Sequence, residues 1–349
     1  MAEPREKLRL IQCGMGGMGK AWRDNVTSPT SPSRSPDFEV VAVVDINEHA
    51  LHEGGDQFRL LPERRFSDLG DAIANIEADA VLTVTPPAVH VEHAQLAFTN
   101  GLHLLTEKPI ADTLENAKLM VGLASRADRQ LVVAQNYRYG AAMAALRKVV
   151  TESPVGRIGH GHLDFYIGAD FTGSFRETME YPLLIDMAIH HLDLIRAVTG
   201  RNIAKVTAMS FRPQWSWYQH EPGLKMLMEL DDGTPFSYSG DWSARGRQTK
   251  WNGDWRLQCG EGSIHLDLDQ IAVARCERWG KEESESPVEV GKSEQNGQAR
   301  ILSDFAGAIR TGKPAETSGA DNLWSFGAVI AGVLSATKGK TIDVDTLLG

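Results

Sequence analysis

Two aspartates and two histidines interrupt an otherwise apolar stretch, LLIDMAIHHLDLIRAV, at residues 183–198. On an α-helix, Asp186, His190 and Asp193 have the spacing i, i+4, i+7 and fall within one narrow stripe. A buried carboxylate without a partner is costly, so the stripe is expected to face solvent, a metal or a cavity in which it does chemistry. A metal is the less favoured alternative, because no third ligand is evident and the sequence has no HExxH motif. His191 lies on the apolar flank of the helix and is expected to be a packed residue. Asp193 is expected to bind His190 or a backbone amide.

A glycine-rich turn is the second chemical pattern. The sequence CGMGGMG gives Gly14, Gly16 and Gly19 the spacing GxGxxG, directly after a buried strand and at the start of a helix. In this context the glycines let the backbone approach a pyrophosphate. The next strand ends at Asp45, where a carboxylate accepts hydrogen bonds from an adenosine ribose and repels the 2′-phosphate of NADP. The pattern therefore predicts an NAD site.

Two further motifs, TPPAVHVEHA (85–94) and TEKPIA (106–111), stand at strand ends. The carboxyl ends of parallel strands are where open α/β sheets bind ligands. Lys108 ends a buried apolar strand and is followed by a proline, so we expect its ammonium at the mouth of a cleft.

The elements that position these residues change in kind near residue 136. Up to that point five short buried strands alternate with helical patterns, which predicts a parallel, doubly wound Rossmann sheet; the strands are 8–13, 40–45, 80–85, 103–108 and 131–136, and the helices 17–26, 47–58, 68–76, 90–99 and 113–126. After residue 150, longer alternating strands predict an α+β region with a large, open, mainly antiparallel sheet. KEESESPVEV (281–290) is expected to be a solvated loop. We thus expect an NAD-binding domain at 1–136 and a substrate-binding and oligomerisation domain at 137–349, whose closing helices are candidates to pack on the first domain.

Composition excludes several classes of function. The 349 residues carry a net charge of −10 without a basic block, which argues against nucleic acid and anionic membranes as partners. Cys13, Cys259 and Cys276 form no CxxC pair, which suits reduced thiols. The start lacks the apolar core of a signal peptide and the apolar stretches are too short to span a membrane, so we expect a cytoplasmic protein. Because the predicted C-terminal sheet lacks helices for both faces, we expect a homodimer or homotetramer.

Taken in order, GxGxxG, Asp45, TPPxxH, EKP, QNYRY (135–139) and DxxxH resemble the glucose–fructose oxidoreductase / inositol dehydrogenase / MocA (Gfo/Idh/MocA) oxidoreductase family. The resemblance runs over almost the whole chain. It departs at EYPLLID (180–186), where many members have a Gly-Gly turn. The resemblance implies that Lys108, Asp186 and His190 meet around the substrate. In such a set His190 suits the general base and Lys108 the donor that stabilises an alkoxide.

The predicted function is hydride transfer between NAD and a secondary alcohol of a small-molecule sugar, glycoside or cyclitol. Two alternatives stay open: an NAD-dependent glycosidase or lyase-like enzyme that acts through transient oxidation, and a nucleotide sensor without catalysis. The predicted catalytic residues are Lys108, Asp186 and His190. The predicted cofactor-binding residues are Gly14, Met15, Gly16, Gly17, Met18, Gly19, Asp45, Ile46, Thr85, Pro86, His90, Glu107, Lys108 and Gln135.

The predicted substrate-binding residues are Lys108, Arg138, Asp186, His190, Trp242 and Trp251. Tryptophan faces suit the C–H surface of a sugar ring. For the two tryptophans, packing on the sheet or at an oligomer interface is the alternative. Arg138 is expected either to touch cofactor or substrate or to brace the domain junction.

Overall fold

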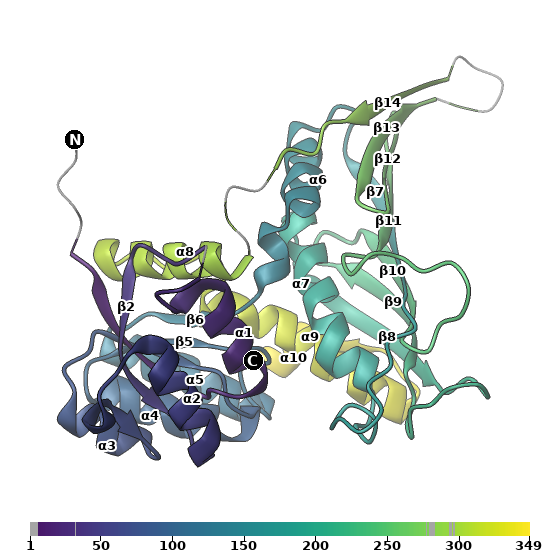
Figure 1. Ribbon diagram of the computed structural model, residues 1–349. Helices are drawn as coiled ribbons and strands as arrows, with labels where there is room; N and C mark the ends of the chain where they lie inside the picture. Colours follow the sequence, from purple (N-terminus) through teal and green to yellow (C-terminus); the bar gives the residue numbers. More distant parts are fainter. Residues whose placement is uncertain (1–5, 32, 277, 279–282, 293–294, 296) are drawn as a thin grey trace, which may run out of the picture. The chain divides into compact units, whose positions relative to one another are not determined.

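The structure is a computed structural model that describes residues 6–31, 33–276, 278, 283–292, 295 and 297–349 (Figure 1). The described chain divides into two compact units. The first unit lies within Met1–Asn136 and Glu294–Leu323, and the second within Tyr137–Ser293 and Trp324–Gly349.

The first unit is built on a parallel sheet with the strand order β3-β2-β1-β4-β5-β6 over the described residues. The strands are β1 Leu8–Cys13, β2 Phe38–Val44, β3 Arg65–Phe66, β4 Ala80–Thr83, β5 His103–Thr106 and β6 Leu131–Val133. The helices are α1 Gly17–Trp22, α2 Glu48–Phe58, α3 Leu69–Asn75, α4 His90–Thr99, α5 Leu114–Ala127 and α8 Gly297–Thr311. Helix α8 lies on the same side of the sheet as α1, and α4 and α5 lie on the other (Figure 1). The predicted doubly wound Rossmann sheet is confirmed.

Polar side chains fix where the helices of the first unit begin. The side chains of Asn47, Asp68 and Thr113 each accept a hydrogen bond from the backbone N–H three residues further on, at the starts of α2, α3 and α5. Such caps satisfy N–H groups that have no partner within the helix. They keep the turns at the strand ends short and hold the predicted motifs at one edge of the sheet.

The second unit has a larger mixed sheet, which over the described residues has the order β14-β13-β12-β11-β7-β10-β9-β8-β15. Only the pairing of β10 with β7 is parallel within this described sheet. The strands are β7 Ile158–Tyr166, β8 Ile203–Phe211, β9 Gly223–Leu230, β10 Pro235–Asp241, β11 Asp254–Cys259, β12 Gly262–Asp267, β13 Gln270–Arg275, β14 Ser284–Val288 and β15 Ile342–Asp343. The helices are α6 Ala141–Glu152, α7 Ala188–Thr199, α9 Gly319–Lys338, which runs across the division between the units, and α10 Val344–Leu348.

The second unit confirms a mostly antiparallel sheet but corrects the loop expected at 281–290. Residues Ser284–Val288 form the edge strand β14, which pairs with β13. Residues 281 and 282 of that stretch lie outside the described residues. The sequence does not predict this strand, because its side chains are nearly all exposed and show no apolar alternation.

Helices α6, α7 and α9 cover one face of the second sheet (Figure 1). In β9 the buried residues Leu224, Met226, Met228 and Leu230 alternate with exposed ones, as a strand covered on one face requires. The uncovered face shows Met209 and Leu227, which are 59% and 66% exposed. Assembly through this face remains a prediction.

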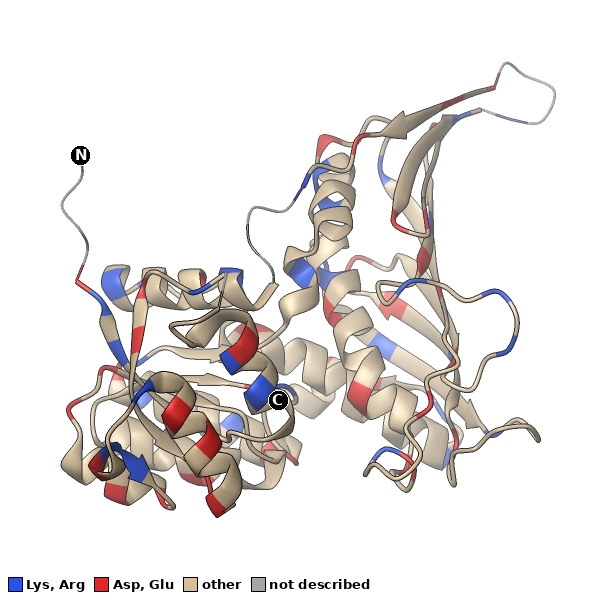
Figure 2. Cartoon of the chain, viewed as in Figure 1, with Lys and Arg blue, Asp and Glu red and all other residues tan. Residues whose placement is uncertain are grey.

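Charged residues of both signs are interspersed over each unit (Figure 2). Among the helices that the structure describes, none is both long and apolar enough to cross a bilayer.

Candidate functional site

The glycine turn between β1 and α1 has two packed glycines and two open ones. Gly14 has φ +86°, and a Cβ there would lie 2.2 Å from the carbonyl oxygen of Val84. A Cβ on Gly19 would lie 2.0 Å from the carbonyl oxygen of Gly14. At Gly16 and Gly17, by contrast, an added Cβ would have no neighbouring heavy atom within 4 Å. The outer glycines therefore serve close packing, and the inner pair leaves backbone open to a pyrophosphate, as a dinucleotide site requires.

Asp45, directly after β2, is held beside this turn. Its Oδ2 accepts a hydrogen bond from the Met15 backbone N–H at 2.6 Å, and its Oδ1 accepts one from Asn47 at 2.7 Å. An ionised carboxylate offers about four acceptor positions, so room remains for the hydroxyls of a ribose. The neighbouring Ile46 is 93% exposed and offers an apolar side chain beside the same carboxylate.

The EKP segment after β5 is fastened to the helix that follows the glycine turn. Glu107 Oε1 accepts a hydrogen bond from Trp22 Nε1 at 2.7 Å, and Oε2 accepts one from the Lys108 backbone N–H at 3.1 Å. Glu107 is nearly buried, and the peptide bond between Lys108 and Pro109 is cis. Glu107 therefore positions the Lys108 backbone at the carboxyl edge of the sheet.

Two predicted cofactor-binding residues, His90 and Gln135, have side chains buried in the interior, and their role in binding the cofactor remains a prediction. The His90 ring joins the two strand-end motifs: Nε2 lies 2.9 Å from the Thr85 carbonyl oxygen, and Nδ1 lies 3.0 Å from the Thr106 hydroxyl. Burial lowers the pKa of His90. His90 Nδ1 also lies 3.1 Å from the Ile110 carbonyl oxygen, so the ring contacts both strand-end segments in the interior.

In the second unit, the DxxxHxxD segment is not one continuous α-helix. Residues Leu183–Met187, which include Asp186, form a π-helical turn, and α7 begins at Ala188 with His190 in its first turn. A π turn changes the angular register, so the expected single stripe does not continue from Asp186 to Asp193. Tyr181, just before the segment, has φ +49°, a conformation that favours glycine.

Asp193 is part of a buried ion pair, which corrects its expected partners. Arg138 donates from Nε and Nη2 to the two carboxylate oxygens at 2.6 and 2.7 Å, and Ser325 Oγ donates to Oδ1 at 2.7 Å. The side chains of Arg138 and Asp193 are 5% and 1% exposed. Such a bidentate pair is a structural brace, so Arg138 ties the start of the second unit to α7.

His191 is a packed histidine, as predicted. Its Nε2 lies 2.9 Å from the Trp251 carbonyl oxygen, and its Nδ1 lies 3.0 Å from the Tyr238 hydroxyl. Burial lowers the pKa of His191 to about 4. The ring is therefore neutral at pH 7, donating to Trp251 and accepting from Tyr238.

Asp186 and His190 have a different kind of neighbour. Arg176 Nε donates to Asp186 Oδ2 at 2.5 Å, and the Tyr137 ring stacks on the His190 ring with centroids 4.4 Å apart. Burial, together with the charge of Asp186, raises the pKa of Tyr137 to about 12, so its hydroxyl stays protonated. We call Asp186, His190, Tyr137 and Arg176 the α7 cluster.

Sequence reasoning missed Tyr137 and Arg176. Tyr137 lies within the quoted QNYRY motif, which was the available signal. Arg176 lies in an irregular segment between β7 and the π turn, where no periodicity identifies a partner.

The two tryptophans predicted to bind substrate differ. Trp242 is 2% exposed and packs edge-on against Phe171 with centroids 5.1 Å apart, so the packing alternative is the correct one for this residue. Trp251 is 43% exposed, and its carbonyl oxygen accepts the His191 hydrogen bond described above. It remains a predicted contact surface for a sugar ring.

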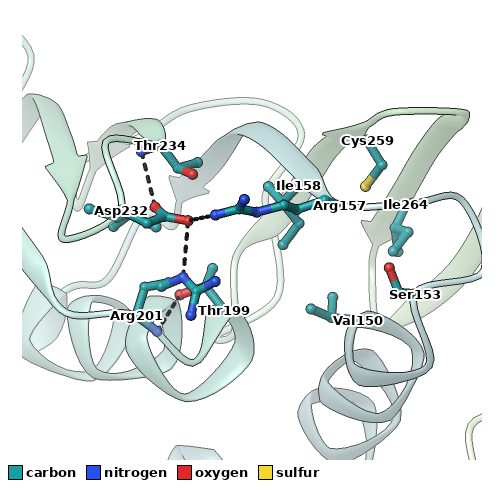
Figure 3. A pocket seen from close by; sticks show the side chains of 12 residues that line it. Val150, Ser153, Arg157, Ile158, Thr199, Arg201, Asp232, Thr234, Cys259 and Ile264 are labelled. Carbon is teal, nitrogen blue, oxygen red and sulfur yellow. Dashed lines mark hydrogen bonds and ion pairs between the residues drawn. The ribbon is translucent and has the colours of Figure 1, made fainter.

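A cavity of about 170 Å³ lies beside the start of β7, the end of α7 and the turn that precedes β10 (Figure 3). Asp232 accepts hydrogen bonds there from Arg157 at 2.8 Å and Arg201 at 3.0 Å, and these contacts tie three segments together. None of the predicted site residues is among the described residues that line it, which are Val150, Ser153, Gly156, Arg157, Ile158, Thr199, Arg201, Leu230, Asp232, Thr234, Cys259 and Ile264.

Comparison with known proteins matches both units to models of one family. Residues 11–135 match the model "Oxidoreductase family, NAD-binding Rossmann fold", and residues 143–265 match "GFO/IDH/MocA C-terminal domain". An uncharacterized protein of Sinorhizobium fredii is 28% identical, with 97% of this chain and 96% of that protein aligned. A D-apiose dehydrogenase of Paraburkholderia graminis is 25% identical over 98% of this chain and 91% of its own length.

A solved structure shares the fold over both units. It is an oxidoreductase from Agrobacterium radiobacter in complex with NAD⁺, L-tartaric acid and magnesium, with a TM-score of 0.85 and 24% identity. The match covers 98% of this chain and 100% of that chain.

Proposed function

Because the chain belongs to the Gfo/Idh/MocA family of NAD-binding oxidoreductases, as its motifs predicted, we propose that it oxidises a secondary alcohol of a sugar, glycoside or cyclitol. The observation that carries the proposal is the α7 cluster. In the same helical segment, His191 and Asp193 have contacts that explain them as structural residues. Asp186 and His190 instead lie among ionisable side chains, which suits proton transfer.

The first unit holds the cofactor in this proposal. The backbone at Gly16 and Gly17 would take the pyrophosphate, and Asp45 would accept hydrogen bonds from the adenosine ribose. Bound NAD supplies a hydride acceptor. Ile46 would contact the adenine through its exposed apolar side chain.

The residues of the chain would handle the proton and the developing charge. We propose that the His190 imidazole takes the proton of the substrate hydroxyl while hydride leaves the same carbon, so that the alcohol becomes a carbonyl. Lys108 would donate a hydrogen bond to the reacting oxygen and stabilise it as it becomes negative. The protonated Tyr137 holds the plane of the His190 ring by stacking, and Asp186 would orient the substrate.

A substrate screen tests the proposal. Purified protein with NAD is offered a panel of aldoses, glycosides and inositols, and the absorbance band of NADH is followed. Net NADH formation with a polyol supports it. Cleavage of a glycoside without net NADH favours the glycosidase or lyase-like alternative, and NAD binding without any turnover favours a sensor.

The cofactor assignment predicts a preference for NADH over NADPH. The Asp45 carboxylate should repel a 2′-phosphate, so NADH is expected to bind at least about tenfold more tightly by fluorescence titration. Asp45→Ser should reduce the difference in affinity between NADH and NADPH. Asp71→Asn, which removes an exposed carboxylate from α3, is the matched control and should leave it unchanged. Equal affinities in the unmodified protein would refute the role of Asp45.

A further inference from the structure

Arg176 uses only a small part of its hydrogen-bonding capacity. Its guanidinium donates from Nε to Asp186. No hydrogen bond joins its two Nη groups to any described residue, and the side chain is 24% exposed. A guanidinium has five N–H donors in a planar fork, so four donors remain for a ligand.

Two phenylalanine rings contact this guanidinium. The Cζ atom of Arg176 lies 4.9 Å from the ring centroid of Phe171 and 4.5 Å from that of Phe175. A contact of this kind uses the positive charge of the guanidinium and does not use up its N–H donors. Because the contacts also reduce the freedom of a long side chain, a ligand that binds to this edge loses less entropy.

The carboxylates nearby are engaged elsewhere. Asp170, Glu177 and Asp241 accept hydrogen bonds within their own loops, from Thr172, Gly173 and Ser243 respectively. Asp186 is therefore the carboxylate that binds Arg176, and it does so through one hydrogen bond instead of two. The edge formed by the two Nη groups has the geometry to take a second carboxylate.

We propose that Arg176 determines substrate specificity by binding a carboxylate of the substrate, so that the substrate is an acidic sugar, such as a uronate or aldonate. The proposal rests on the function proposed above, because it places this carboxylate next to Asp186 of the α7 cluster. The Nη groups bind the acid in a bidentate manner while Nε stays on Asp186. Asp186 and His190 then face the hydroxyl-bearing part of the same molecule.

Binding measurements test the proposal without requiring turnover. Calorimetry on the protein with NADH compares matched pairs: D-glucuronate with D-glucose, and D-galacturonate with D-galactose. The acids are expected to bind about 10- to 100-fold more tightly, the usual worth of a hydrogen bond to a charged group. Arg176→Gln should remove this preference. Equal affinity within both pairs, or no binding of either acid, overturns the proposal.

Two further variants separate specificity from general damage. Arg176→Lys keeps the charge but loses the fork, so it should keep only part of the preference for acids. Arg247→Gln removes an exposed arginine that pairs with Asp267 and should keep the full preference. If Arg176→Gln folds and still binds the acids more tightly than the neutral sugars, the proposal is overturned.

Turnover then distinguishes the two proposals. If acids are oxidised, Arg176→Gln should raise KM for the acid and change kcat less. Binding of acids through Arg176 without any NADH formation would refute the proposed oxidation and leave the carboxylate site standing. Oxidation of neutral sugars alone would refute the carboxylate site and leave the proposed oxidation standing.

Discussion

Two arginine–aspartate pairs have their aspartates on one short segment of the second unit, and the two pairs are built differently. The pair between Arg138 and Asp193 is 5% and 1% exposed and uses two parallel hydrogen bonds, with a third to the carboxylate from Ser325. The pair between Arg176 and Asp186 is 24% and 12% exposed and uses one. The first pair is saturated by protein groups, whereas the second has donors left for a ligand.

The adjacent histidines also have different surroundings. Both nitrogens of His191 contact protein groups in the interior, and burial keeps its pKa low. His190 instead stacks on Tyr137, close enough to Asp186 for that carboxylate to affect the Tyr137 pKa. Residue type alone therefore does not separate structural from chemical groups here. The contacts of His191 with Tyr238 and Trp251 identify it as a structural group.

The largest expected effect is a loss of turnover when His190 is replaced. His190→Ala should lower kcat by about 10²- to 10⁴-fold, because a positioned general base contributes that much. The affinity for NADH should persist, since the residues proposed to hold NAD belong to the first unit. Steady-state kinetics and fluorescence titration on the same preparation measure both.

His191→Asn is the matched control for that experiment. It should lower the melting temperature and leave kcat within about tenfold of the unmodified protein, because His191 packs against Tyr238 and Trp251. Near-normal turnover in His190→Ala together with loss of turnover in His191→Asn would reverse our assignment.

The next effect concerns stability and compares the two aspartates. Asp193→Ala leaves the Arg138 guanidinium buried without its carboxylate and should lower the free energy of unfolding by about 3–5 kcal/mol. Asp186→Ala breaks the more exposed pair with Arg176 and should lower the free energy of unfolding by about 1 kcal/mol. Urea unfolding of both variants gives the comparison. Equal losses would show that the two pairs do not differ in the way proposed here.

The sequence predicted five of the six described strands of the first unit, with boundaries within three residues of the observed ones, and missed the two-residue strand β3. Its strands are short buried runs and its helices amphipathic, so hydrophobic periodicity marks both, and the glycine spacing marks the turn between β1 and α1. The second unit was predicted in outline only. The sequence of strand β14 predicts a loop, because an exposed edge strand carries no apolar pattern.

The site was predictable as far as regular geometry holds. A uniform 100° per residue places Asp186, His190 and Asp193 on one stripe, but the π turn at Leu183–Met187 breaks that register. The sequence also did not reveal which charged groups form pairs. Arg138 lies 55 residues from Asp193 in the sequence, and Arg176 lies in a loop. Pairing over such separations depends on tertiary structure, which no local pattern encodes.

A further expected effect is a dependence of stability on pH that comes from His191. In the folded protein its pKa is lowered to about 4, while an unfolded histidine titrates near 6.5. As the pH falls below 6.5 the unfolded chain binds a proton that the folded chain does not, so stability present above pH 6.5 is lost progressively down to pH 4. The full loss is about 3 kcal/mol, at 1.36 kcal/mol for each pKa unit. His191→Asn cannot titrate, so its free energy of unfolding should fall less steeply over this range, whatever its value at pH 7. Urea unfolding at half-unit pH steps measures both curves, and parallel curves would mean that His191 is not held neutral by burial.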